Sequence, residues 1–156
     1  YAGKKSVYIE TPYFVPTDSM LTAIQATAMS GIEVFFVMPD RSDNAKVGYV
    51  PNSYVEQLLT SNIKVYRYTD GFIHSKLMVI DDEITIVGSS NMDIRSFDLN
   101  FETTLFIYNP ETARKAKEII LDDINNSRRV TRKEWEKRST WQEFKEAFFR
   151  LFSPFL

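Results

Sequence analysis

Residues 32–39, IEVFFVMP, are apolar at nearly every position and rich in β-branched and aromatic side chains. A strand with one exposed face alternates apolar and polar residues, whereas this segment would bury both faces. It is therefore predicted to lie inside a sheet that is flanked by helices. The need for cover on both faces restricts the possible folds more than any other feature of the chain.

Strand-like and helix-like segments alternate along the first 69 residues. Thr17 or Asp18 is placed to cap the first helix, and Gly31 is placed to end it. The order strand, helix, strand, helix, strand predicts an α/β fold with a central mixed, largely parallel sheet. The expected segments are strand 6–10, helix 20–30, strand 32–39, a helical stretch interrupted by Pro51 and continuing through 53–61, and strand 62–69.

The pattern changes after Gly71 to two adjacent strands, 76–80 and 84–88, which predict a β-hairpin. A strand at 99–108, a helix at about 111–125 and a basic, helical connection at 128–138 follow. We expect one domain, 1–156, with an α/β core at about 1–127 and a helical extension at 128–156. This length is enough to bury a sizeable core.

Composition excludes several classes of protein. Nineteen basic and 21 acidic residues give a net charge of -2 and a pI near 5.5, which is not typical of a general nucleic-acid binder. There is no cysteine, so neither disulfides nor cysteine zinc sites can form. No apolar run approaches the roughly 20 residues that span a bilayer.

We expect a soluble piece of a longer protein, because the chain begins at Tyr1 and enters a strand almost at once.

The hairpin carries a cluster of polar residues. His74 and Lys76 are two residues apart, so they share one face of their strand. If the turn is centred between Asp82 and Glu83, then Ser89 and Asn91 lie opposite them on the same face. A three-residue turn would shift the register by one and remove this convergence.

An imidazole, an ammonium, a hydroxyl and an amide around one small space suit a phosphoryl group, because its oxygens are negatively charged. Gly88 would let the backbone approach such an anion closely. His74, the only histidine in the chain, could instead be structural. Asp81 lies at the turn, where a structural carboxylate is the favoured interpretation.

These residues follow the pattern H-x-K-x4-D-x6-G-S-x-N, and here the chain resembles the phospholipase D superfamily. The segments YIETPYFVP, GFIHSKLMVIDD, GSSNMDIRSFDLNFE and RLFSPFL are similar to the carboxyl-terminal half of bacterial cardiolipin synthases. The resemblance implies a layered phospholipase D-like fold. It also implies transfer of a phosphatidyl group between two phosphatidylglycerol molecules, giving cardiolipin and glycerol through a phosphohistidine, with no metal and no cofactor.

The resemblance also assigns roles to residues. It implies covalent or acid/base catalysis for His74 and a partner carboxylate of a catalytic histidine for Glu102. It implies phosphate binding for Lys76, Ser89 and Asn91. Asp81 would belong to the catalytic motif, and Arg95 is a possible head-group contact. Tyr13 and Arg41 are weaker candidates, because they follow strand ends, where α/β sheets place ligand loops.

Phosphohistidine chemistry needs a second group to protonate the leaving alkoxide, and this chain has one motif copy. The resemblance therefore implies a second half as partner, either upstream in the same protein or in a homodimer, with His74 as general acid/base. It further implies a bacterial cytoplasmic-membrane location for the parent protein. A hydrolytic phospholipase D, a homodimeric phosphodiesterase or nuclease, and a non-catalytic phosphate- or partner-binding module are the alternatives.

The last segment, from Ser139, has a helix-capping start and an apolar stripe along one helical face. A stripe of this kind predicts a docking face for another part of the protein, and contact with a membrane surface is the alternative. The stripe consists of Trp141, Phe144, Phe148 and Leu151.

Overall fold

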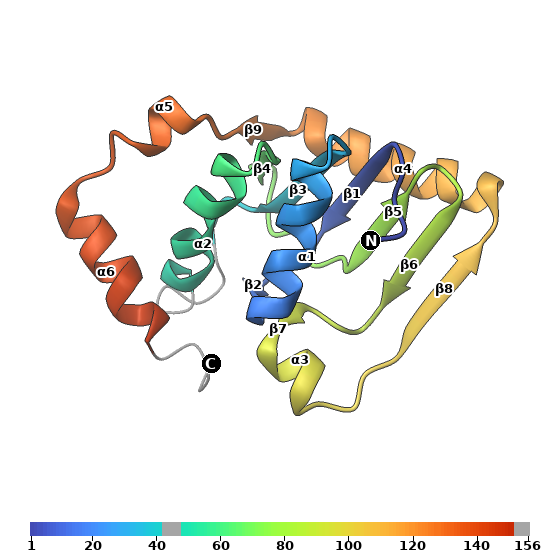
Figure 1. The fold of residues 1–156 in the computed structure, drawn as a ribbon, viewed down its shortest axis with the longest axis horizontal. Helices are drawn as coiled ribbons and strands as arrows, with labels where there is room; N and C mark the ends of the chain where they lie inside the picture. The colour runs from blue at the N-terminus through green and yellow to red at the C-terminus, as the bar shows by residue number, and fades with distance from the viewer. Residues whose placement is uncertain (42–47, 152–156) are drawn as a thin grey trace.

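The computed structural model describes residues 1–41 and 48–151 as a mixed sheet with helices on both faces (Figure 1). This agrees with the α/β fold expected from the sequence. The strands are β1 (Ser6–Glu10), β2 (Phe14–Val15), β3 (Glu33–Pro39), β4 (Lys64–Tyr68), β5 (Leu77–Ile80), β6 (Ile84–Gly88), β7 (Met92–Asp93), β8 (Thr104–Tyr108) and β9 (Ser127–Arg129). The helices are α1 (Asp18–Met29), α2 (Tyr49–Thr60), α3 (Ile94–Asp98), α4 (Pro110–Asn125), α5 (Arg132–Trp135) and α6 (Thr140–Arg150).

The main sheet has the order β8-β6-β5-β1-β3-β4-β9. Its centre is parallel, because β1 pairs with β3 and β3 pairs with β4 in the same direction. The hairpin of β5 and β6, together with β8 and β9, adds antiparallel strands on both sides. A short second sheet of β2 and β7 joins the two loops that lead to the site.

Two layers of helices cover the sheet. Helices α1 and α2 pack on one face and α4 packs on the other, each over its own apolar cluster (Figure 1). The prediction that β3 is an internal strand is confirmed, because its side chains from Val34 to Met38 alternate between these clusters and Val34, Phe36, Val37 and Met38 are at most 1% exposed. Both faces of β3 can be apolar because helices cover both faces of the sheet.

The helix boundaries follow from local signals in the sequence. Thr17 caps α1 by accepting a hydrogen bond from the Met20 N–H (3.3 Å), and Asn109 caps α4 in the same way through Thr112 (2.8 Å). Gly31 follows α1 with a φ of 93°, a conformation that glycine adopts without a Cβ clash. Pro51 does not interrupt α2, since it lies in the first turn, where no hydrogen bond from its nitrogen is needed.

The predicted hairpin exists, but its predicted register is wrong. Ile80 pairs with Ile84 and Met78 pairs with Ile86, so the turn holds three residues, Asp81 to Glu83. Asp81 and Asp82 both have positive φ, 55° and 58°. Lys76 therefore lies opposite Gly88 and not opposite Ser89.

Asp81 explains why the turn takes this form. Its carboxylate accepts hydrogen bonds from three consecutive backbone N–H groups at the start of the chain, those of Lys4 (2.6 Å), Lys5 (2.8 Å) and Ser6 (2.9 Å). Burial tends to raise the pKa of Asp81, but these hydrogen bonds and the charge of Lys5 outweigh it and lower the pKa below 3.8. The carboxylate thus fixes the turn against β1.

Two other expectations need correction. The strand expected at 99–108 begins at Thr104, so Asn100 and Glu102 lie in the loop before it. The helical connection expected at 128–138 is partly wrong, because residues 127–129 form β9 against β4 before the single-turn helix α5. Hydrogen bonding to an open sheet edge outweighs helix propensity in this basic segment.

Replacing Asp81 with asparagine is expected to lower the free energy of unfolding by about 1–2 kcal/mol at neutral pH, since the amide accepts fewer hydrogen bonds and carries no charge. The folded-state pKa is lowered, so this contribution is complete above pH 3.8 and disappears as pH falls below that value. Chemical denaturation from pH 7 to pH 2 measures it. The Glu83→Gln variant, at an exposed carboxylate in the same turn, is the control, and an equal, pH-independent loss in both variants would contradict the assignment.

Gly88→Ala is expected to destabilise the pairing of β6 with β8 by about 1–3 kcal/mol. A Cβ at Gly88 would lie 2.1 Å from the Thr103 carbonyl oxygen and 2.9 Å from the Thr104 Cα, both of which are backbone atoms. Thermal unfolding and hydrogen exchange of the Ser89 N–H, which donates to the Thr103 carbonyl, measure the effect. An unchanged melting temperature with unchanged exchange would show that β8 can move away at no cost.

Candidate active site

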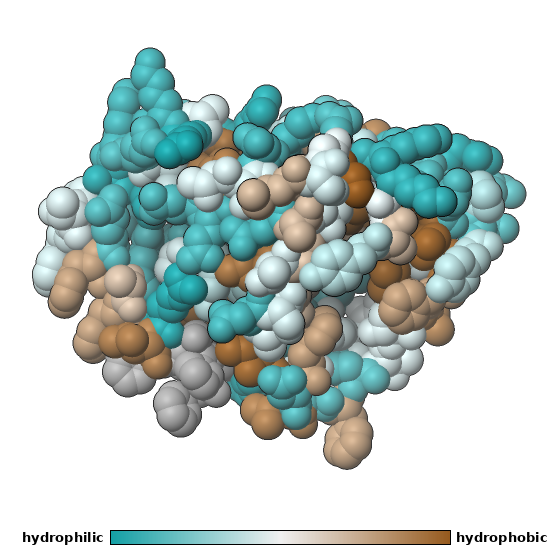
Figure 2. Space-filling model, in the orientation of Figure 1, coloured by the Kyte–Doolittle hydropathy of each residue, from teal (hydrophilic) through white to brown (hydrophobic). Residues whose placement is uncertain are grey.

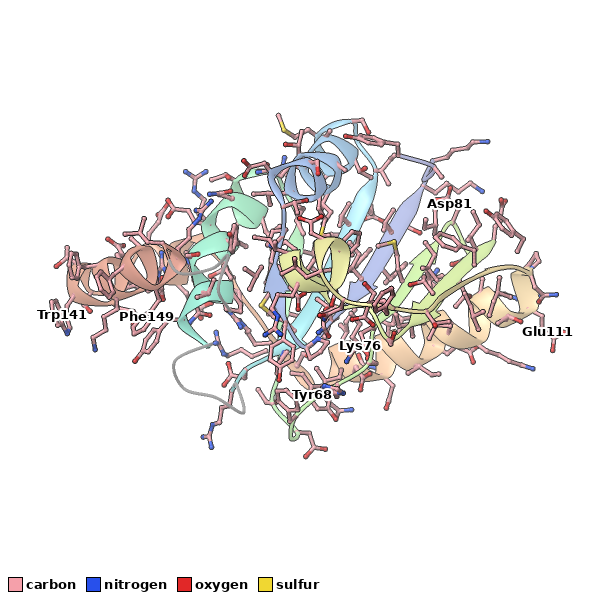
Figure 3. The ribbon with its side chains drawn as sticks, turned by 90° about the horizontal axis from the view of Figure 1, so that it is seen from below. Tyr68, Lys76, Asp81, Glu111, Trp141 and Phe149 are labelled. Atoms are coloured by element: carbon pink, nitrogen blue, oxygen red, sulfur yellow. The ribbon has the colours of Figure 1, made fainter. Side chains whose placement is uncertain are left out.

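A cavity of about 400 Å³ opens where β5 begins and β6 ends. It collects side chains from β1, the hairpin, the loop after β6, helix α3 and the start of β8. Lys76 lies at this end of the hairpin, and Asp81 lies at the other end (Figure 3). The polar residues that line the cavity are Glu10, Thr11, Lys76, Ser90, Asn91, Ser96, Glu102 and Thr104.

Lys76 is the cation of the site, and it lies beside His74 as expected. Its Nζ donates to the His74 carbonyl oxygen (2.9 Å) and is 3.3 Å from each ring nitrogen of that residue. Burial lowers the pKa of Lys76, while the carboxylates of Glu102 and Asp93 act in the opposite direction. The ammonium group is thus held at the cavity wall by its own loop and by two acidic neighbours.

His74 lies in the loop that precedes β5, and its side chain is exposed and not among those that line the cavity. The ring of Tyr13 lies edge-on to the imidazole with centroids 6.3 Å apart, and the ring of Phe72 lies 5.8 Å away. The contact of the imidazole with Lys76, which does line the cavity, places it next to this site. The prediction that Tyr13 belongs to a ligand loop stays a prediction.

Ser89 does not point into the cavity, contrary to the convergence argued from the sequence. Its hydroxyl donates to Glu102 and accepts from the Thr103 N–H (3.0 Å). Gly88 allows this contact because the backbone before β8 lies so close to it that a Cβ would not fit. Gly88 therefore permits a close approach of the β8 backbone, and not of an anion as the sequence suggested.

Glu102 lies in the cavity wall, between Ser89 and Lys76. Its carboxylate accepts hydrogen bonds from Ser89 and Asn100, and the contact with a catalytic histidine that the family resemblance implied stays a prediction. The hydrogen bond from Ser89 is the largest cause that lowers the pKa of Glu102, and the charge of Lys76 adds to it. Glu102 is therefore an anion that faces the Lys76 ammonium.

Asn91 is held in place by a residue that the sequence argument missed. Its backbone N–H donates to the Ser96 hydroxyl (3.1 Å), and the Ser96 N–H donates to Asp93, which caps α3 (2.7 Å). Within residues 1–41 and 48–151, the Asn91 Oδ1 is buried without a hydrogen-bond partner. Buried polar atoms are rarely left unpaired, so this oxygen is a ready acceptor for a bound group. The capping pattern from Asp93 to Ser96 was the signal that could have identified Ser96.

Glu10 is a second missed residue. It lies at the end of β1, is 1% exposed, and has carboxylate oxygens with no hydrogen-bond partner among the described residues. Burial, followed by the nearby Asp123, raises the pKa of Glu10 to about 8. Glu10 is therefore mostly protonated at neutral pH and adds no negative charge to the wall beside Lys76.

The remaining candidates lie outside the cavity. Arg95 is exposed on α3, whereas the next two residues of this helix, Ser96 and Phe97, line the cavity. Arg41 is exposed after β3. Asp81 is fixed at the far turn of the hairpin by the backbone of residues 4–6.

The floor of the cavity is apolar. Its side chains come from both hairpin strands, α3 and β8, and they continue from the polar end without a break. They are Leu77, Met78, Ile86, Val87, Met92, Phe97 and Phe106. A cation, polar groups and hydrocarbon line one cavity, which gives an amphipathic site. Among the described ranges, no three His, Asp or Glu side chains are grouped as metal ligands are.

Comparison with known proteins agrees with this geometry. Residues 2–124 match the family model "Cardiolipin synthase, PLD-like domain". Cardiolipin synthases of Staphylococcus aureus and Listeria monocytogenes are both 43% identical over 155 residues, which is 99% of this chain. These residues cover 31% and 32% of the two relatives, so the chain spans about a third of their length.

Two solved structures share the fold. The phospholipase D family member Nuc from Salmonella typhimurium superimposes with a TM-score of 0.72 at 21% identity, over 83% of this chain and 84% of its own. The phosphatidylserine synthase of Haemophilus influenzae gives a TM-score of 0.75 at 19% identity, over 98% of this chain and 40% of its own. The family model covers well over half of the chain, and the hairpin carries the motif on the fold that these structures share. The chain therefore belongs to the phospholipase D-like domain family of the cardiolipin synthases.

Proposed function

We propose that this chain is the second catalytic half of a cardiolipin synthase and that it handles the phosphatidyl group of phosphatidylglycerol. The observation that carries the proposal is the amphipathic cavity, in which Lys76 and Asn91 share the lining with seven large apolar side chains. A nucleic-acid backbone would need an extended basic groove, and the chain has a net charge of -2. A diacyl phospholipid presents one phosphate and hydrocarbon, which match the two kinds of lining group in this cavity.

The chemistry follows from the groups at the polar end. An imidazole nitrogen attacks phosphorus, the bond from phosphorus to the glycerol oxygen breaks, and a second imidazolium protonates the departing alkoxide. A hydroxyl of another phosphatidylglycerol then attacks the phosphohistidine, loses its proton to that second imidazole and releases the first. His74 is the only histidine here, so one of the two imidazoles must come from another half. By resemblance to two-copy relatives, His74 is the acid/base.

Lys76 and Asn91 would hold the phosphoryl oxygens during both steps. Lys76 offers a positive charge, and the Nδ2 group of Asn91 donates to the phosphoryl oxygens. The Asn91 Oδ1, unpaired within the described residues, is an acceptor and does not bind them. Glu102, in the cavity wall, and Ser89, behind it, would act through Lys76. The Ser89 hydroxyl positions Glu102, whose charge favours the protonated form of Lys76.

The second half would cover the exposed apolar surface beside the cavity. Large side chains of α3, the loop after it and β8 are unusually accessible there, with Phe97 59% and Phe101 fully exposed. Exposed apolar patches of this kind mark protein interfaces. A partner at this surface would bring its own imidazole to the mouth of the cavity next to His74. We therefore place the other half of the enzyme against α3 and β8.

We further propose that the parent protein acts at the bacterial cytoplasmic membrane, where its lipid substrates are. Within residues 1–41 and 48–151, no helix is long and apolar enough to cross a bilayer. Attachment would come from other parts of the parent protein or from a surface of this domain.

The first test is complementation in detergent micelles. This chain is mixed with the upstream half of its parent protein and phosphatidylglycerol, and cardiolipin, glycerol and phosphatidic acid are quantified. We expect cardiolipin and glycerol in equal amounts, and a roughly 10²–10⁴-fold lower rate with His74→Ala. Lys76→Met should also abolish turnover, whereas Lys115→Met, at an exposed ion pair, should not. Phosphatidic acid as the sole lipid product would favour a hydrolytic phospholipase D, and full activity of His74→Ala would exclude the proposal.

The second test concerns Glu102. Its charge raises the pKa of Lys76, so Glu102→Gln should lower that pKa and move the alkaline limb of the pH–rate profile to lower pH. We also expect a decrease in kcat of about tenfold at neutral pH. Glu111→Gln removes an exposed carboxylate from α4 and is the matched control. A profile that is the same in all three proteins would remove Glu102 from the mechanism.

A further inference from the structure

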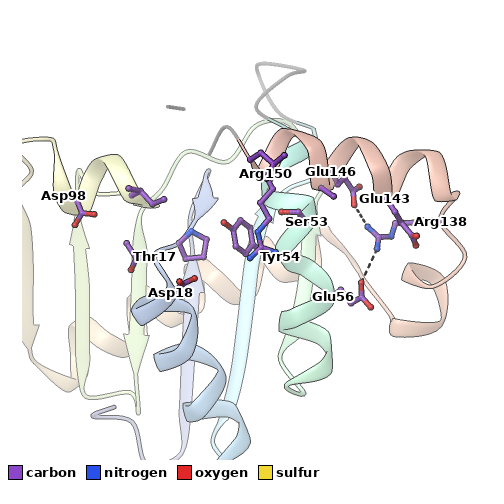
Figure 4. Close-up of a pocket in the computed structure, with 14 residues that line it drawn as sticks. Thr17, Asp18, Ser53, Tyr54, Glu56, Asp98, Arg138, Glu143, Glu146 and Arg150 are labelled. Carbon is purple, nitrogen blue, oxygen red and sulfur yellow. Dashed lines mark hydrogen bonds and ion pairs between the residues drawn. The ribbon is translucent and has the colours of Figure 1, made fainter. Parts of the chain in front are cut away.

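Helix α6 has two distinct faces, and its inward face is fixed to α2. The ring of Phe149 stacks on Tyr49 with centroids 5.3 Å apart, and the Arg150 guanidinium lies 4.3 Å from the centre of the Tyr54 ring. Glu146, 3% exposed, forms an ion pair with Arg138, which also pairs with Glu56 (Figure 4). Rotation of α6 would break the ion pair of the buried Glu146 carboxylate, which is energetically unfavourable. The pair therefore fixes the orientation of α6 on α2.

The opposite face of α6 is apolar and exposed. Trp141 is 63% exposed, Phe144 58%, Phe148 46% and Leu151 73%, and we call these four residues the aromatic face. Their rings form a continuous row, with centroids 5.6 Å apart from Trp141 to Phe144 and 6.3 Å apart from Phe144 to Phe148. Figure 2 shows tan and brown atoms over α6 at the lower left of the molecule.

Charge is distributed unevenly between this segment and the rest of the chain. Residues 128–156 contain eight Lys and Arg and four Glu, a net charge of +4, whereas residues 1–127 contain 11 basic and 17 acidic residues, a net charge of -6. Lys145 belongs to α6 itself, and its Nζ lies 5.4 Å from the centre of the Trp141 ring. Helix α6 itself has no net charge, with two basic and two acidic residues, so the positive charge of the segment comes from residues 128–138 before it. An aromatic helix face beside a basic segment is typical of proteins that bind at the surface of an anionic membrane.

The position of α6 argues against the other catalytic half as the occupant of this face. That half must approach β6, β8 and α3, because the cavity lies there. Helix α6 packs on α2, which lies over β4 near the opposite edge of the sheet (Figure 1). Leu151, at the end of α6, lines a pocket together with Ile94 and Asp98 of α3, whereas Trp141, Phe144 and Phe148 line neither that pocket nor the cavity. A domain seated over the cavity would therefore leave these three rings uncovered.

We propose that the aromatic face of α6 is a membrane-surface anchor that inserts into the interface of an anionic phospholipid bilayer. Trp141, Phe144, Phe148 and Leu151 would enter the region between headgroups and acyl chains, while Lys145 and the exposed Lys133 and Lys137 contact lipid phosphates. The inference is independent of catalysis, because the anchor and the cavity use different residues. It gives the domain its own means of staying at a bilayer.

The test measures binding of the whole chain to vesicles. The His74→Ala chain, which cannot turn over lipid, is sedimented with vesicles of mixed phosphatidylglycerol and phosphatidylcholine, and with vesicles of phosphatidylcholine alone. We expect binding to the anionic vesicles that weakens with salt. Phe144→Gln combined with Phe148→Gln should reduce partitioning by roughly tenfold or more, because two rings no longer leave water. Met29→Gln combined with Ile119→Gln removes exposed apolar side chains from α1 and α4, and should bind normally.

Fluorescence of Trp141 locates the contact. Trp135→Phe leaves Trp141 as the single tryptophan, and its emission should shift to the blue when anionic vesicles are added. Circular dichroism confirms that each variant is folded. Equal binding by the α6 variant and its control, or no binding of the folded chain to anionic vesicles, would overturn the proposal. It would also fail if Trp141 shifted on addition of the upstream half without lipid and did not respond to vesicles.

Discussion

The carboxylate of Asp81 accepts hydrogen bonds from three backbone N–H groups that precede β1, and the rest of the site depends on this clamp. It joins residues about 75 positions apart and holds the hairpin turn at positive φ. The turn fixes the β5–β6 register, and the register places Lys76 opposite Gly88 at the cavity. A motif residue can thus be essential to a site without touching what the site binds.

Close packing of β6 against β8 is the second constraint. Gly88 has no room for a Cβ, so β8 approaches closely enough for the Ser89 hydroxyl to contact both Glu102 and the Thr103 N–H. The negative charge of Glu102 in turn raises the pKa of Lys76. Backbone packing and the electrostatics of Lys76, the proposed phosphate ligand, are therefore parts of one arrangement.

The two exposed apolar surfaces serve different proposed purposes. The surface on α3 and β8 borders the cavity, where we propose that another half supplies the second imidazole. The aromatic face lies on α6, next to a segment of net positive charge, and its Leu151 lines a pocket together with Ile94 and Asp98 of α3. Helix α3 also contributes Ser96 and Phe97 to the cavity, so a domain anchored through α6 would keep the cavity near its lipid substrates.

The sequence by itself determined the class of fold and the chemical groups of the site. The alternation of strands and helices, the burial of β3, the caps Thr17 and Asn109, and the pairing of His74 with Lys76 all arise from local periodicity and spacing. Tertiary structure alone decided the hairpin register, the contact of Ser89 with Glu102 and the role of Ser96. These features depend on contacts between distant segments, such as residues 4–6 with Asp81 and Thr103 with Gly88, and local patterns carry no information about such contacts.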